Sequence, residues 1–220
     1  RPRHRAGRMS VSRRIGGSVL LLLALPLAAA AQEPAGEVVR PQWAHDVSLS
    51  WYFLHDGSNY GQPAATADQG PVHLEARYNY EALRTASFFV GWNLAFGDTV
   101  TFTLTPIAGC MVGNAGGPIL GLELSLEWGP LSWSSQGEWV TDLVGGTGGY
   151  LYAWSELAVS PWEWLRLGVA LQRTRVFHTP REVIFGPLLG VSVWKLDLSA
   201  YWFQPGGTAQ TFVVSAAVSF

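Results

Sequence analysis

The sequence predicts an all-β protein, a closed antiparallel β-barrel whose strands cross a membrane, and three observations support this. Apolar and polar residues alternate with a period of two in segments of about ten residues, bounded by turn residues. The composition is glycine-rich and aromatic, with 25 Gly, 11 Trp and only 14% charged residues, which leaves little polar surface to face water. After residue 31 no apolar run reaches the roughly 18 residues of a membrane-spanning helix.

The first 31 residues are predicted to be a secretory signal peptide with an upstream extension. Arg13 and Arg14 form a positive region, residues 19–31 form an apolar run, and its last three alanines suit cleavage. The run is shorter than the roughly 20 residues that span a bilayer. We therefore expect an N-terminal periplasmic segment over residues 32–44 and one barrel domain over residues 45–220.

Without its first 31 residues the chain is acidic. These residues hold six of the 14 Lys and Arg and none of the 16 Asp and Glu, which leaves eight against 16 and a net charge of about −8. No basic run remains, so nucleic acid is not an expected partner. Cys110 is the single cysteine, so no internal disulfide is expected, and no motif implies a cofactor.

The alternation is clearest in the last ten residues, where one face is entirely apolar: Phe212, Val214, Ala216, Val218 and Phe220. This pattern resembles the assembly signal of Gram-negative outer-membrane barrels, with Phe220 as its terminal aromatic. Residues 76–81, 154–157 and 171–175 are also similar to stretches of small outer-membrane barrels of an uncharacterised family. The resemblance covers about residues 45–220. It implies an outer-membrane location, with lipid, lipopolysaccharide and the assembly machinery as partners, and it implies no activity.

The turn residues give a strand count through parity. Short turns are expected at one rim, at residues 68–70, 97–98, 129–130, 161–162 and 194–195. Longer loops are expected at the other rim, at residues 82–85, 113–117, 143–149, 177–181 and 204–209. With a first strand at 45–54 and a weak second one at 61–67, the total is twelve strands, with ten as the alternative. Pro106 and Pro187 fall within strands, and we expect a bulge at each because proline cannot donate to a ladder.

Tryptophan placement favours lipid, not a protein core, against the apolar face. In the parity scheme one group of aromatic residues collects at the rim of short turns: Trp128, Trp162, Trp164, Trp194 and Phe220. A second group lies toward the opposite rim: Trp51, Trp139, Trp202 and Phe212. Two such groups are typical of the aromatic girdles of membrane barrels. A secreted, soluble β-sandwich would turn the same apolar face inward and stays open as an alternative.

The opposite, polar face is then predicted to line the lumen. Its members are His73, Glu75, Arg77, Asn79, Glu81, Glu123, Glu127, Glu138, Glu156, Arg166 and Asp197. They either pair and fill the barrel, because buried charges are costly unless paired, or set the selectivity of a pore. Carboxylates outnumber arginines, which favours cations or polar neutral solutes. Inward-facing aromatic residues would narrow the lumen: Tyr150, Tyr152, Trp154 and Tyr201.

These features favour a monomeric, narrow channel for small solutes or a structural envelope protein over an enzyme. A lipid-modifying hydrolase of the outer membrane is the alternative from another class. Outer-membrane lipid hydrolases of similar size use a His-x-Ser pair on one face of a strand, and no such pair occurs in this sequence. The two nearest His and Ser pairs, His45 with Ser48 and His55 with Ser58, are three residues apart and fall on opposite faces of a strand. No catalytic residue is therefore assigned.

Two further polar pairs were weighed for binding. His73 and Glu75 offer two metal ligands on one face, but other strands would have to supply the rest, so a paired lumen histidine is favoured and no metal site is expected. Arg173 and Arg175 fall on the outward phase and are predicted to contact lipid headgroups. Pairing of these arginines with loop carboxylates such as Glu182 is equally open.

Overall fold

The computed structural model describes residues 42–55, 58–146, 148–176, 182–207 and 210–220. Every regular element in these ranges is a strand. The bounds are β1 (Ala44–Leu54), β2 (Tyr60–Gln69), β3 (Val72–Tyr78), β4 (Thr85–Trp92), β5 (Leu94–Phe96), β6 (Val100–Gly113), β7 (Gly117–Trp128), β8 (Leu131–Val140), β9 (Tyr150–Trp162), β10 (Leu165–Val176), β11 (Glu182–Val193), β12 (Leu196–Phe203) and β13 (Thr211–Ser219). No helix of the described ranges is long and apolar enough to cross a membrane. The predicted signal peptide, most of the predicted periplasmic segment and the predicted loop at 177–181 lie outside the described residues.

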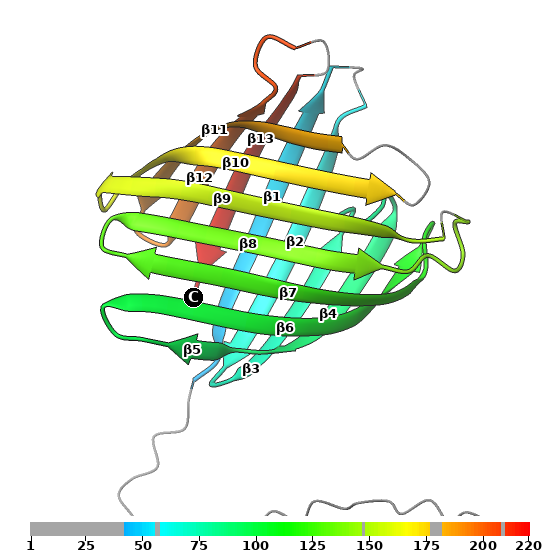
Figure 1. Cartoon of the computed structure of the whole chain (residues 1–220), viewed down its shortest axis with the longest axis horizontal. Helices are drawn as coiled ribbons and strands as arrows, with labels where there is room; N and C mark the ends of the chain where they lie inside the picture. Colours follow the sequence, from blue (N-terminus) through cyan, green and yellow to red (C-terminus); the bar gives the residue numbers. More distant parts are fainter. Residues whose placement is uncertain (1–41, 56–57, 147, 177–181, 208–209) are drawn as a thin grey trace, which may run out of the picture. The chain divides into compact units, whose positions relative to one another are not determined.

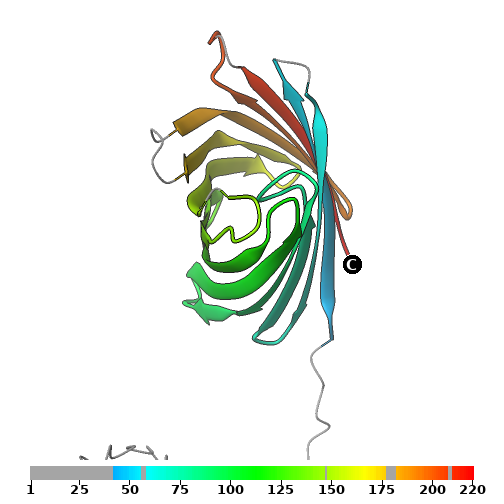
Figure 2. The same cartoon turned by 90° about the vertical axis from the view of Figure 1, so that its right-hand side faces the viewer.

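The strands form one antiparallel sheet that closes on itself (Figures 1 and 2). Strands pair with their neighbours along the chain, and β1 pairs with β13. β4 and β5 both pair with β6 in one continuous register, so they are two halves of one strand. The described part of the barrel therefore has twelve strands, as the sequence predicts. The weakly predicted second strand is β2, which pairs with both β1 and β3.

Figure 1 shows the tilt of the strands, because β6 to β9 of the near wall cross in front of β1, β2 and β13 of the far wall. One rim, which we name the turn rim, carries short turns at residues 70–71, 97–99, 129–130, 163–164 and 194–195. The other, the loop rim, carries connections at residues 79–84, 114–116 and 141–149, and the first and last of these are longer than the turns of the turn rim. β9 continues to Trp162, so its turn follows two residues later than predicted. β3 ends at Tyr78, earlier than predicted.

The predicted bulges at Pro106 and Pro187 are wrong. The register of β6 with β7, and that of β10 with β11, runs through both prolines without a shift. Each missing N–H is accommodated where the ladder on one side is interrupted. Opposite Pro106, the ladder between β6 and its neighbour is interrupted, because β4 ends and β5 begins there. The ladder between β11 and β12 extends only to Leu188, so Pro187 is not part of it. A local gap thus suffices, and no extra residue is needed. A register shift occurs instead between Leu165 and Leu167, opposite the end of β9.

The outer surface of the barrel is apolar. Along β7, for example, Leu120 and Leu122 are exposed whereas Ile119 is buried. Exposed aromatic residues lie toward the turn rim, Trp128, Trp162, Trp164, Trp194 and Phe220, and toward the loop rim, Trp51, Trp139, Trp202 and Phe212. The outward hydroxyls of Ser135 and Ser155 bond to each other at 2.8 Å, so neither needs water. An apolar exterior with two aromatic girdles is the arrangement of an outer-membrane barrel, not of a soluble sandwich.

The interior is filled unevenly. Two apolar clusters occupy it from about mid-height toward the loop rim: one of Phe89, Ile107, Met111, Ala115, Ile119, Val140, Tyr150 and Tyr152, and one of Tyr52, Ala158, Ala170, Leu188, Tyr201, Phe203 and Val213. Trp154 packs against both clusters. Toward the turn rim the inward positions are polar, and several of them are small, for example Thr101, Thr103, Ser125 and Ser134. The predicted narrowing by inward tyrosines is thus found in the half nearer the loop rim.

Candidate functional site

The candidate site is a network of ionisable side chains that crosses the lumen from β3 to β7 and β8. The two-residue repeat of β3 places His73, Glu75 and Arg77 on its inward face. Glu123 of β7 and Glu138 of β8 face them from the other wall, with β4 and β6 lying between β3 and β7 around the barrel. These contacts therefore bridge the interior and do not follow the sheet.

Arg77 is the centre of this network, and only 1% of its side chain is exposed. Its Nε donates to Glu75 Oε1 at 2.6 Å, and its Nη2 donates to Glu75 Oε2 at 2.5 Å and Glu123 Oε1 at 3.2 Å. Its Nη1 donates to Glu138 Oε1 and lies 3.5 Å from Glu81 Oε1. The planar, five-donor guanidinium suits a site in which several carboxylates converge.

Aromatic and amide groups support the network. The guanidinium carbon of Arg77 lies 4.5 Å from the ring centre of Tyr80 and 4.4 Å from that of Phe89. The Tyr80 hydroxyl donates to Gln136 Oε1 at 2.8 Å, and the Gln136 amide donates to Glu123 Oε1 at 3.0 Å and Glu138 Oε1 at 2.9 Å. The arginine and its carboxylates are thus held in place from β8 as well as from β3.

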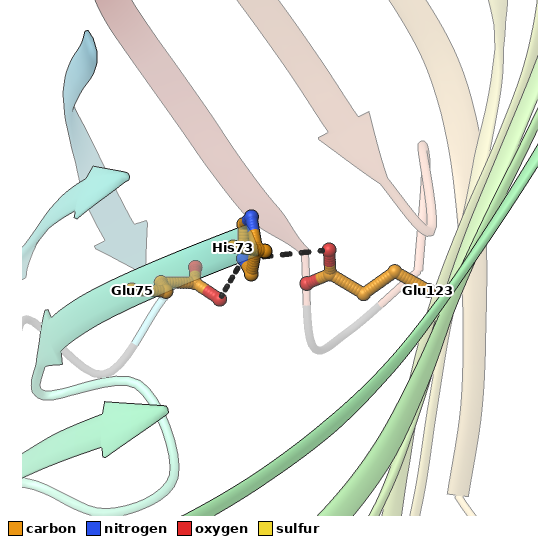
Figure 3. A group of neighbouring side chains, drawn as sticks. All are labelled: His73, Glu75 and Glu123. Atoms are coloured by element: carbon orange, nitrogen blue, oxygen red, sulfur yellow. Dashed lines mark ion pairs between the residues drawn. The ribbon is translucent and has the colours of Figure 1, made fainter. Parts of the chain in front are cut away.

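His73 is oriented by a chain of hydrogen bonds. Its Nδ1 lies 2.9 Å from Asp68 Oδ1, which also accepts a bond from Asn93 Nδ2 at 2.6 Å. Thr105 Oγ1 in turn donates to Asn93 Oδ1 at 2.6 Å, so the gap between β4 and β5 is used to hold Asn93. The Nε2 of His73 points to Glu75 Oε2 at 3.7 Å and Glu123 Oε2 at 4.0 Å (Figure 3). It has no hydrogen-bond partner in the described part of the chain.

A second, wetter ion pair lies on the neighbouring wall. Arg166 Nη1 lies 3.2 Å from Glu156 Oε2, and its Nη2 donates to Ser199 Oγ at 2.9 Å. Glu156 Oε1 accepts bonds from Trp154 Nε1 and from the Tyr201 hydroxyl, both at 2.8 Å. The Arg166 side chain is 36% exposed, which contrasts with the enclosed Arg77.

Three cavities follow this series of contacts. One of about 360 Å³ toward the turn rim is lined by Arg166, Asp197 and Ser199, among others. One of about 280 Å³ is lined by Thr103, Thr105, Glu123, Ser125, Ser134, Gln136 and Trp154. One of about 140 Å³ lies between Ser50, Tyr52, Gln62, Tyr80, Trp154, Glu156, Tyr201 and Val213. Trp154 borders both of the latter two, so it lies between them.

Negative charge exceeds positive charge around Arg77. Five carboxylates, Asp68, Glu75, Glu81, Glu123 and Glu138, surround one arginine and one histidine. Burial raises the pKa of the Glu81 carboxyl, which lies in the 79–84 segment, although the Ser87 hydroxyl and Arg77 oppose this. Even without Glu81, the other four carboxylates outnumber the one permanent cation. Uncompensated charge in an enclosed site is unfavourable, so this excess calls for protons or a cation.

Several residues predicted to line the lumen lie outside this network. Glu127 and Asp197 are inward on their strands but exposed near the turn rim. Asn79 is not on the strand as predicted. It has a φ of 60°, its Nδ2 donates to Gly61 O at 2.9 Å, and its Oδ1 accepts the Arg84 N–H at 2.6 Å. Asn79 therefore shapes the turn after β3, because a left-handed residue with a short amide side chain can end the strand there.

Of the arginines predicted to contact headgroups, Arg173 is on the outward phase of β10, opposite Ala153 of β9, and Arg175 is paired with Leu151 in the same register. Their role stays a prediction. Of the His and Ser pairs weighed for catalysis, His45 and Ser48 lie on opposite phases of β1, as expected. Sequence reasoning missed Asp68, Tyr80, Asn93 and Gln136 as members of the network. Asp68 and Gln136 do fall on inward phases of β2 and β8, and this signal could have found them.

Comparison with known proteins identifies the fold. No family model and no curated protein matches the chain. Among solved structures, the KdgM porin matches with a TM-score of 0.57 at 10% identity, over 80% of this chain and 99% of that one. OccK3 (OpdO) of Pseudomonas aeruginosa matches with a TM-score of 0.43 at 8% identity, over 77% of this chain and 60% of that one. The fold is that of a small Gram-negative outer-membrane β-barrel. At these identities the likeness concerns the fold and not a substrate.

Proposed function

We propose that the protein is a narrow channel through the bacterial outer membrane for small cations and small polar solutes. The observation that supports this is the run of polar cavities inside a barrel whose exterior is apolar. A barrel that served only as a stable envelope component would gain more from a fully apolar, packed interior than from enclosed charges. The KdgM porin shares this fold, which agrees with the proposal.

The narrowest part of the proposed path lies at Trp154, between the two smaller cavities. Tyr52, Tyr80 and Tyr201 border the cavity on one side of it, and Glu156 places a carboxylate there. Aromatic walls with few carboxylates admit small solutes one at a time and repel anions. The excess of carboxylates over Arg77 and Arg166 gives the lumen its preference for cations.

Single-channel recording in planar lipid bilayers tests the proposal. The refolded full-length barrel should show discrete openings, and in a KCl gradient the reversal potential should shift toward that of K⁺. Glu156→Gln should weaken this preference, because it removes a carboxylate at the narrow part and frees the charge of Arg166. Asp98→Asn is the matched control, since Asp98 is an exposed carboxylate in the turn at residues 97–99. Membranes that stay silent at all voltages would favour a structural envelope role instead.

We also propose two contacts of the outer surface. Arg173 and Arg175, near the loop rim, would bind phosphates of lipopolysaccharide through charge-assisted hydrogen bonds. Phe220 would act as the terminal residue recognised by the outer-membrane assembly machinery. Replacing both arginines with Gln should lower the amount of lipopolysaccharide that co-purifies, and Phe220→Ala should lower the yield of assembled barrel. Unchanged amounts in either experiment contradict the corresponding contact.

A further inference from the structure

We propose that His73, Glu75 and Glu123 bind one divalent transition-metal ion of the Zn²⁺ type inside the lumen. One imidazole nitrogen and two carboxylate oxygens, from two facing walls of the barrel, converge on one point (Figure 3). The three candidate ligand atoms all lie within 4.8 Å of one another. A mixed nitrogen and oxygen set of this kind is one that Zn²⁺ accepts, with water in a fourth position.

The distances require only small adjustments. The His73 Nε2 is 3.7 Å from Glu75 Oε2 and 4.0 Å from Glu123 Oε2. Ligands held at about 2.1 Å around a tetrahedral Zn²⁺ are roughly 3.4 Å apart. These two distances differ from that value by a few tenths of an ångström. The two carboxylate oxygens lie within 4.8 Å of each other, so they have to approach by up to about 1.4 Å, which rotation of the glutamate side chains can supply without a change in the backbone. To bind the metal, Glu75 Oε2 has to give up its bond from Arg77 Nη2, while Oε1 keeps the bond from Arg77 Nε. Arg77 Nη2 keeps its second acceptor, Glu123 Oε1.

The histidine is prepared for this role. Its side chain is 7% exposed, and its Nε2 has no hydrogen-bond partner among the described residues, although it points at two carboxylates. Its other nitrogen is bound to Asp68, which is itself fixed by Asn93. A carboxylate that holds the far nitrogen of an imidazole, and so fixes its tautomer and ring orientation, is the usual outer partner of a metal-binding histidine.

The negative charge around the site and its contact with a cavity also support the binding of a metal ion. The carboxylates around Arg77 outnumber it, so a divalent cation would compensate buried negative charge that Arg77 alone does not. Glu123 also lines the 280 Å³ cavity, which gives an ion a route to the site and room for the fourth, water ligand. An imidazole ligand disfavours Ca²⁺ and Mg²⁺, which prefer oxygen alone.

Zn²⁺ titration of the purified full-length barrel in detergent, against a chelating indicator, is the direct test. We expect one site per chain that millimolar Ca²⁺ or Mg²⁺ does not displace. His73→Ala should weaken binding at least tenfold. Asp68→Asn should weaken it by about 10- to 100-fold, although Asp68 touches no metal in this proposal, because the outer partner is lost. His45→Ala is the matched control, since His45 is exposed on the outward phase of β1, and binding should be unchanged.

A rescue variant separates metal binding from a structural role of His73. Each variant is first checked for a folded barrel by its heat-modifiable migration in gels. His73→Glu supplies a carboxylate on a side chain long enough to approach the position of Nε2, so it should restore part of the Zn²⁺ binding, whereas His73→Gln, of the same length but with a much weaker ligand, should not. The proposal is overturned if the wild-type barrel binds no stoichiometric Zn²⁺, or if folded His73→Ala binds it as tightly as the wild type. Both results concern binding alone, so they leave the proposed channel activity to its own test.

Discussion

Replacing Arg77 with Met isolates the cost of leaving the network without its cation. Methionine reproduces the arginine side chain as far as Nε and lacks the guanidinium group that lies over Tyr80 and Phe89. The control variant described below loses the same atoms, so the comparison isolates the effect of the surroundings. The carboxylates of Glu81 and Glu138, with 1% and 0% of their side chains exposed, would lose their positive partner. Removal of one member of a buried ion pair typically costs about 3–5 kcal/mol. We therefore expect the free energy of unfolding to fall by about 3–5 kcal/mol.

Arg166→Met is the matched control in the same lumen. Arg166 also pairs with a glutamate, at 3.2 Å, but its side chain is 36% exposed, so solvent screens the pair. Exposed pairs contribute about 0–1 kcal/mol, and the control should lose no more than that. Adding Glu138→Gln to Arg77→Met should recover part of the loss, because it removes one of the carboxylates that Arg77 neutralises.

Reversible unfolding by urea or guanidinium of the barrel in detergent or lipid vesicles measures these differences, with tryptophan fluorescence as the signal. The reasoning predicts a gap of several kcal/mol between the two arginine variants. If Arg77→Met and Arg166→Met lose the same free energy, the carboxylates around Arg77 are hydrated or neutral in the folded barrel. The account of an enclosed ionic network would then be wrong.

Two further predictions concern the backbone and pH. At Gly186 a Cβ would lie 1.9 Å from the Trp202 carbonyl oxygen, so Gly186→Ala should lower the unfolding free energy by about 1–3 kcal/mol. Gly137→Ala is the control and should change the unfolding free energy little, because nothing lies within 4 Å of a Cβ at that position. Equal losses in the two variants would refute the close approach of β11 and β12. Because burial raises the pKa of Glu81, its protonated form contributes stability at low pH that is lost as the pH rises above the ordinary value of 4.5. Glu81→Gln should remove this part of the pH dependence, and an unchanged profile of unfolding free energy against pH would contradict it.

The two-residue repeat predicts which face of a regular strand is polar. It placed His73, Glu75 and Arg77 on one face of β3, and the turn residues gave twelve strands and the two rims. Whether a side chain faces inward depends on its position in the alternation of its own strand, which is a local property. A shift of the strand by one residue would turn all its side chains to the opposite face of the sheet. β2 is weakly apolar, and the parity of the turns, not alternation, predicted it.

Contacts across the lumen could not be predicted in the same way. The bond between Arg77 and Glu138 depends on the stagger of the strands and on the width of the barrel, which no local pattern encodes. The role of Asn93 depends on the gap opposite Pro106, and the sequence alone suggested a bulge there instead. Asn79 continues the alternation of β3 in the sequence, but its bonds to Gly61 and Arg84 end the strand. The alternation of apolar and polar residues does not reveal where side-chain hydrogen bonds replace the backbone hydrogen bonds between strands.

The central claim is that the apolar face of every strand meets lipid while the carboxylates face an enclosed lumen. Spin labels placed one at a time along β7, at residues 119–126, in a Cys110→Ala background and in lipid vesicles, test it most directly. At even positions, such as Leu122 and Leu124, the label should collide with oxygen dissolved in lipid and be shielded from a water-soluble nickel chelate. At odd positions, such as Glu123 and Ser125, oxygen accessibility should be low. The opposite alternation, with Glu123 in contact with lipid or bulk solvent and Leu124 enclosed, would contradict the account.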